Sequence, residues 1–232
     1  MDTPITKKQF LAAYYRFQNW DYEPMLWISE DRRVTDEFPL FLHRSLDKIV
    51  VQTDESHLSL REPIDESSSN QAILEALGFD NLQIKEHTKI LFAMEPIELP
   101  DYEGLTIKSL TEGDKIAVGQ FKAMCTHFDQ RPSLINLDDD LLYGVYHQSD
   151  LLALGSIWVV SEDLSSLQLL VHPKFRNVGL GYLLFGWLIR VAFRKNTIPF
   201  VVHDASDSVI THLALKAKLV EALSSYIYTT HV

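Results

Sequence analysis

The chain has 232 residues, a net charge of −11 and a single cysteine, Cys125. Its hydrophobic fraction of 46% and charged fraction of 23% are typical of a soluble globular protein with one or two domains. No apolar run approaches the roughly 18 residues that span a bilayer, and residues 1–8 lack the apolar core of a signal peptide. One cysteine excludes an internal disulfide. These features predict a cytoplasmic protein with no membrane partner.

The acidic charge is unevenly distributed. Residues 1–100 carry 10 Lys/Arg and 18 Asp/Glu, a net −8, whereas residues 101–232 carry 11 and 14, a net −3. Binding to a nucleic-acid backbone requires clustered Lys and Arg, so we expect no nucleic-acid partner. An acidic surface is compatible with a cationic or amine substrate.

The N-terminal part mixes helical and strand patterns. Apolar residues at helical spacing predict a helix over 6–20, and weaker patterns suggest a helix over 36–46 and strands over 48–53 and 57–61. Residues 67–77 read as a helix capped by serine and closed by Gly78-Phe79, followed by a strand over 87–94. Two prolines, a glycine and several acids over 95–104 indicate a linker. We therefore expect an α/β region over residues 1–97 and a second domain over 104–232.

The C-terminal part alternates strands and helices. It begins with a strand over 105–110 and a helix over 111–124 for which Thr111 is a plausible N-cap. A hairpin follows over 141–147 and 151–160, and the remaining expected elements are strands over 167–171, 198–203 and 222–230 and helices over 181–193 and 205–218. Such alternation predicts an α/β fold with a mixed sheet.

A glycine-rich turn is the most informative feature of the sequence. It lies where the strand over 167–171 gives way to the helix over 181–193, and it contains Gly179 and Gly181. Glycine lets a ligand approach the backbone closely, and the first N–H groups of a helix favour an anion such as a pyrophosphate. Arg176 and Lys174 add positive charge beside the turn. The alternative is an ordinary strand–turn–helix whose glycines serve packing.

The pattern of this turn separates it from two other glycine motifs. A dinucleotide fingerprint needs G-x-G-x-x-G, and a nucleotide P-loop ends in Gly-Lys-Ser/Thr; the turn has neither. Arg176-x-x-Gly179-x-Gly181, after a strand that ends Val171-His-Pro173, resembles the acyl-CoA-binding motif of the GNAT superfamily of N-acyltransferases. The resemblance covers about 55% of the chain, and its element order over 104–232 is the one that a GNAT fold requires.

The resemblance also assigns a cofactor-binding site. The strand before the motif would bind the pantetheine arm through the backbone of Leu169, Leu170 and Val171. The pyrophosphate would lie on the N–H groups of Arg176, Asn177, Val178, Gly179, Leu180, Gly181 and Tyr182. In residues 1–97, the helix closed by Leu77-Gly78-Phe79 and followed by a strand resembles the last third of a GNAT domain. That region is either a degenerate GNAT half or a plain α/β accessory region.

The catalytic groups depart from the family pattern. GNAT enzymes usually take the amine proton with a Glu and supply the thiolate proton from a Tyr. Here no carboxylate lies between Ser165 and His172, and Ala214 stands where the Tyr belongs. The substitutes are His203 at the end of its strand, Gln168 through a bound water, and Asp129 near the acceptor region. No Cys/His cluster has metal-ligand spacing, so we expect no metal.

The reading that the resemblance implies is an N-acetyltransferase that moves an acetyl group from acetyl-CoA to an unknown primary amine by direct attack in a ternary complex. One alternative is a non-catalytic acyl-CoA-binding or partner-binding module, which Ala214 favours. Another is a structural α/β protein with no CoA site. The oligomeric state stays open, with a homodimer among the alternatives.

Overall fold

The structure is a computed structural model that describes residues 4–20, 25–31, 33–45, 47–58, 60, 63–65, 67–99, 102–129, 135, 138–139 and 141–230, with the side chains of 127–129 excepted. The chain forms two compact units, each built from segments that are separate in sequence. Unit 1 comprises Met1–Thr6, Phe92–Val201 and Val209–Val220, and unit 2 comprises Lys7–Leu91, Val202–Ser208 and Glu221–Val232.

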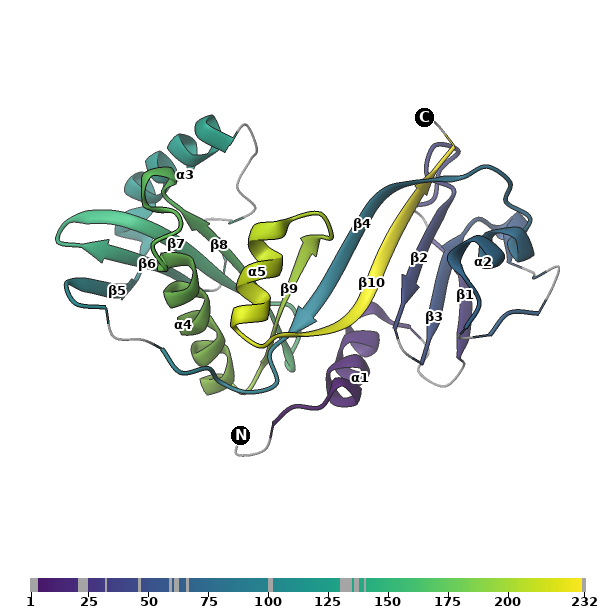
Figure 1. Ribbon diagram of the computed structural model, residues 1–232, viewed down its shortest axis with the longest axis horizontal. Coiled ribbons are helices and arrows are strands. Elements are labelled where there is room, and N and C mark those ends of the chain that lie inside the picture. The colour runs from purple at the N-terminus through teal and green to yellow at the C-terminus, as the bar shows by residue number, and fades with distance from the viewer. Residues whose placement is uncertain are drawn as a thin grey trace. The chain divides into compact units, whose positions relative to one another are not determined.

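Unit 1 is built on strands that follow one another along the chain (Figure 1). They are β5 (Leu105–Ser109), β6 (Leu141–His147), β7 (Asp150–Val159), β8 (Leu164–Val171) and the start of β9 (Ile198–Asp204), in the spatial order β9-β8-β7-β6-β5. The pairs from β5 to β8 are antiparallel, and β8 pairs with β9 in parallel. The crossover from β8 to β9 is a helix, as a parallel pair requires.

Two helices cover opposite faces of the unit 1 sheet. Helix α3 (Lys115–Asp129) packs through Val118 and Phe121 on Leu154 of β7. Helix α4 (Leu180–Arg194) packs on the other face, where a Cβ added to Gly155 would lie 2.8 Å from Leu188 Cδ1. Successive strand residues point to opposite faces of a sheet, so Leu154 faces α3 and its neighbour Gly155 faces α4. Helix α5 (Ser208–Lys216) follows β9, and its Leu213 and Ala214 are buried.

Unit 2 holds the remaining elements (Figure 1). They are α1 (Lys7–Gln18), β1 (Leu26–Glu30), β2 (Leu40–Arg44), β3 (Ile49–Thr53), α2 (Asn70–Leu77), β4 (Gln83–Phe92) and β10 (Val220–Thr229), with the strand order β1-β3-β2-β10-β4. Helix α2 packs its apolar face on β2 and β3. Ser69 caps α2 by accepting from the Ala72 N–H, and Gly78 ends it in a left-handed conformation with φ +85°. The predicted serine cap and glycine end are therefore confirmed.

Two expectations for unit 2 are corrected, and one strand was missed. The expected helix over 36–46 is wrong, because its described core forms β2, which lies between β3 and β10 and pairs with both. A strand buried on both faces reads as a continuous apolar run, which periodicity does not distinguish from a buried helix. The expected strand over 57–61 is wrong at its start, since Glu55–His57 forms a 3-10 turn; residues 59 and 61 lie outside the described residues. Strand β1 was not predicted.

The expectations for the C-terminal part are confirmed. Each expected strand and helix is present, with ends that shift by a few residues. At the start of α3, the Asp114 carboxylate accepts from the Thr111 N–H at 2.8 Å and from its hydroxyl at 3.0 Å. The α/β fold class with a mixed sheet is also confirmed. The domain ranges 1–97 and 104–232 remain a prediction.

Candidate acyl-CoA site

The glycine turn joins β8 to α4 through an irregular segment. His172 Nδ1 accepts from the Lys174 N–H at 3.1 Å, and Pro173–Phe175 forms a 3-10 turn. Asn177 has φ +64° and Gly179 has φ +91°. A left-handed conformation costs an L side chain about 1–2 kcal/mol, and Asn and Gly tolerate it best. Both residues therefore serve the backbone path of the turn.

Gly179 is also enclosed by a neighbour. The Tyr102 hydroxyl donates to the Gly179 carbonyl oxygen at 3.4 Å, and a Cβ at position 179 would lie 2.3 Å from that hydroxyl. The backbone conformation favours a glycine here, and any side chain would also have to displace the Tyr102 hydroxyl. Tyr102 lies 77 positions away in sequence, and no sequence signal marks it as part of the turn.

Gly181 differs from Gly179 because the protein itself does not require a glycine there. A Cβ would lie 3.7 Å from Leu169 Cδ1 and 3.7 Å from Val171 Cγ2, which is ordinary van der Waals contact, and Gly181 has no positive φ. The missing Cβ therefore leaves room at the start of α4 that packing does not use. This is what an approaching ligand would need.

The N-terminus of α4 offers donors and positive charge. Gly179 is the N-cap and has no side chain with which to bond the first N–H groups of the helix, those of Leu180, Gly181 and Tyr182. The Lys216 ammonium lies 4.5 Å from the centre of the Tyr182 ring. Arg176 turns back and donates through Nε to the Val171 carbonyl oxygen at 3.2 Å. The dipole and these cations favour an anion at this end of the helix.

Strand β8 is longer than the part of it that pairs with β9. Three residue pairs join the two strands, and the last is Ser166–Phe200, whereas β8 continues to Val171. The backbone N–H of His172 donates to the Leu152 carbonyl oxygen at 2.9 Å. Backbone groups alternate in direction along a strand, so those of His172, Leu170 and Gln168 all point to β7. Leu169 and Val171 therefore direct theirs to the other side, where the pairing with β9 has ended. Of the three predicted pantetheine contacts, Leu170 is the one whose backbone faces β7.

The candidate catalytic residues lie in different places. Gln168 shares the sheet face of Leu154 and Leu170, which α3 covers, and its Oε1 is buried with no hydrogen-bond partner in the described structure. His203 is 7% exposed, and neither ring nitrogen has a partner among the described residues. Strand alternation places His203 on the face of β9 opposite to Phe200.

Two further positions bear on catalysis. Asp129 is the last residue of α3, and its side chain lies outside the described residues. Ala214, at the position where the family has Tyr, is 3% exposed within α5. A buried methyl group donates no proton, so position 214 holds no acid for a leaving thiolate.

The described residues also form a pocket that is separate from the predicted site. A pocket of about 230 Å³ lies at the start of α3, beside Thr111, Lys115 and Leu142, and none of the predicted site residues lines it. Within the described ranges, no group of three or more His, Cys, Asp or Glu side chains could hold a metal ion. No helix in the described part is long and apolar enough to cross a membrane.

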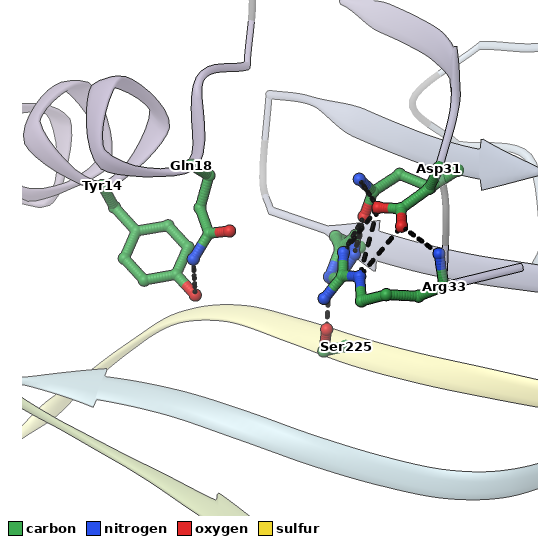
Figure 2. A network of polar contacts seen from close by, with 7 residues as sticks. Tyr14, Gln18, Asp31, Arg33 and Ser225 are labelled. Carbon is green, nitrogen blue, oxygen red and sulfur yellow. Dashed lines mark hydrogen bonds and ion pairs between the residues drawn. The ribbon is translucent and has the colours of Figure 1, made fainter.

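Unit 2 contains a polar network that the sequence did not indicate (Figure 2). Arg33 forms an ion pair with Asp31 at 2.7 Å and donates to Gln52 Oε1 at 3.0 Å. His43 Nε2 lies 2.9 Å from the same oxygen, and Ser225 of β10 hydrogen-bonds to His43 Nδ1. Burial lowers the pKa of His43 to about 4, so the imidazole is neutral at pH 7. The network links β10 to β2, β3 and the segment after β1.

The chain is similar to known proteins in its structure and not in its sequence. No protein-family model matches the sequence, and no curated protein matches it either. Solved structures do match, each at 15% identity: a GNAT-family structure from Novosphingobium aromaticivorans (TM-score 0.50), an acetyltransferase from the GNAT family from Colwellia psychrerythraea (0.52) and a GCN5-related N-acetyltransferase from Sphaerobacter thermophilus (0.53).

These matches are partial. They cover 65%, 70% and 70% of this chain and 68%, 63% and 56% of the three structures, so the chain spans less than two thirds of the length of the latter two. Identity this low shows the fold alone. The chain has the fold of the GNAT acetyltransferases, which is the fold that the resemblance implied.

Proposed function

We propose that this chain is an N-acetyltransferase that transfers an acetyl group from acetyl-CoA to a primary amine. The observation that carries the proposal is the exit of β8: the strand continues five residues past its last pair with β9 and ends in the Gly179–Gly181 turn at the start of α4. An exposed strand edge supplies hydrogen bonds for an amide-containing arm, and an uncapped helix N-terminus supplies donors for a pyrophosphate.

In this proposal the pantetheine arm lies along Leu169 and Val171, whose polar groups point away from β7. The pyrophosphate lies on the N–H groups between Arg176 and Tyr182, in the room left by Gly181. Arg176, Lys174 and Lys216 supply the positive charge around it.

The chemistry is direct acyl transfer. The amine nitrogen attacks the thioester carbon, the C–S bond breaks, the amine loses one proton and the CoA thiolate gains one. Holding the two reactants together supplies much of the rate, so a site without a strong acid can still turn over. With Ala214 buried, we assign the thiolate proton to water or to the reacting amine.

A second candidate is a module that binds acyl-CoA without turnover. Ala214 favours it, because the usual proton donor is missing, and so does the lack of a carboxylate on β8.

Calorimetry with acetyl-CoA tests the binding site. We expect binding, with stabilisation by about 2.7 kcal/mol at a hundredfold excess over the dissociation constant. No heat and no change in melting temperature at millimolar acetyl-CoA would refute the site. A thiol-release assay over a panel of amines then separates the two candidates, since binding without release supports the non-catalytic module.

A further inference from the structure

Two polar side chains, the buried Ser156 and the partly buried Gln168, stand opposite each other on the α3 face of the unit 1 sheet. Ser156 of β7 and Gln168 of β8 are direct cross-strand partners. Ser156 is 1% exposed, and its Oγ has no hydrogen-bond partner in the described structure; the same holds for Gln168 Oε1. A buried oxygen without a partner destabilises the folded state, so two such neighbours indicate that a bound group completes their hydrogen bonds.

The position of this pair relates it to the acyl-CoA site. Ser166–Phe200 is the last pair between β8 and β9, and Gln168 is the next β8 residue on the same face. The pair therefore lies where the two strands begin to separate, and Leu169 is the next residue along β8. The described titratable side chains of the α3 face near these strands are His172, Tyr146 and Cys125, and none of them is a partner of either oxygen.

We infer that Ser156 Oγ and Gln168 Oε1 form the subsite for the acceptor nitrogen, and that they take it as the neutral primary amine. This inference rests on the proposed acetyltransferase function and names the residues that bind its acceptor and the protonation state in which the acceptor binds. Two N–H groups of a primary amine donate to the two oxygens, and the lone pair stays free for the thioester carbon. Neither oxygen carries a charge, so the pair gives an ammonium ion no counter-charge and favours the free base.

It follows that the fall of kcat/KM at low pH, the acid limb of the pH profile, is set by protonation of the amine substrate. The amine loses its first proton to solvent before it binds, and the second after it attacks, when the C–S bond breaks and the thiolate takes up a proton. With no carboxylate or histidine as base, the pH at which kcat/KM falls should follow the basicity of the amine.

The experiment uses ethylamine and the much less basic trifluoroethylamine as acceptors, with thiol release from saturating acetyl-CoA measured against pH. We expect the acid limb to move with the amine. Ser156→Ala and Gln168→Leu should each raise KM for the amine about tenfold, the loss of one hydrogen bond, with an unchanged Kd for acetyl-CoA. Ser165→Ala is the matched control: its hydroxyl lies on the same strand but is paired with Thr197 Oγ1 at 2.7 Å, so it should leave KM unchanged.

Gln168→Glu is a second variant, which should fold because glutamate has the same shape as glutamine. Its carboxylate would accept an ammonium ion, so the acid limb should move to lower pH. The inference is overturned if both amines give the same limb and Asp129→Asn moves it, or if neither amine releases thiol from protein that binds acetyl-CoA. Failure to bind acetyl-CoA is a different result, which refutes the proposed function itself.

Discussion

The Tyr102 hydroxyl occupies the space that a side chain on Gly179 would need, 2.3 Å from the Cβ position. The two residues are joined by a hydrogen bond from the phenol to the Gly179 carbonyl oxygen. The linker after residue 95 is thereby attached to the glycine turn. The turn is thus shaped by a residue outside its own motif.

Gly179→Ala should destabilise the protein by about 1–3 kcal/mol, because alanine at φ +91° is strained and its Cβ collides with Tyr102. Urea unfolding measures the change. Gly181→Ala is the control: its Cβ would make only 3.7 Å contacts, so stability should stay within about 0.5 kcal/mol. Equal stability of the two variants would contradict the structural difference between these glycines.

Gly181→Val should abolish acetyl-CoA binding while the fold is retained. The branched side chain would fill the room at the start of α4 where the pyrophosphate must approach the N–H groups. Calorimetry should show an affinity at least about 100-fold weaker, and circular dichroism should show an unchanged helix content. Wild-type affinity in this variant would place the phosphate site elsewhere.

Local signals made much of the fold predictable. The serine before α2, the glycine after it and the Thr111–Asp114 start of α3 act within a few residues, and each is present as expected. The glycine turn was predicted for the same reason. Strand β2 was mistaken for a helix because what defines it is pairing with β3 and with β10, about 180 residues away, and no local pattern reports that.

The site was predictable only where it depends on backbone. The motif located Gly179 and Gly181, but Tyr102 and Lys216 reach the turn through the fold. Gln168 was selected as the polar residue of its strand, whereas its pairing with Ser156 depends on the β7–β8 register. Ser156 stands within an apolar run, where a small polar residue gives little signal.

His203→Phe should leave turnover within about twofold and should not lower stability. The imidazole is buried and neither nitrogen has a partner among the described residues, so an apolar ring of similar shape removes two unsatisfied atoms. Thiol release and urea unfolding measure the two quantities. A loss of about 100-fold in the maximal rate, with unchanged acetyl-CoA affinity, would instead make His203 the general base.

The buried His43 should make the protein less stable as the pH falls from 6.5 to 4. Burial lowers its pKa from 6.5 to about 4 in the folded protein. Between these values the unfolded chain binds a proton that the folded chain does not, so stability rises with pH across the window and is constant with respect to this group above it. The neutral ring fits the network. Gln52 Oε1 can only accept, so His43 Nε2 donates to it, and Nδ1 accepts from the Ser225 hydroxyl.

Urea unfolding at pH 7 and pH 4.5 tests this expectation, and the difference should be about 2 kcal/mol. His43→Gln should remove most of that difference, whereas the exposed His212→Gln should retain it. Asp31 affects stability in a different pH range. Its hydrogen bond from Arg33 lowers the pKa of its carboxyl below 3.8, so its contribution to stability is lost only at more acidic pH. If the wild type and His43→Gln lose the same stability between pH 7 and 4.5, the burial of His43 is not the cause.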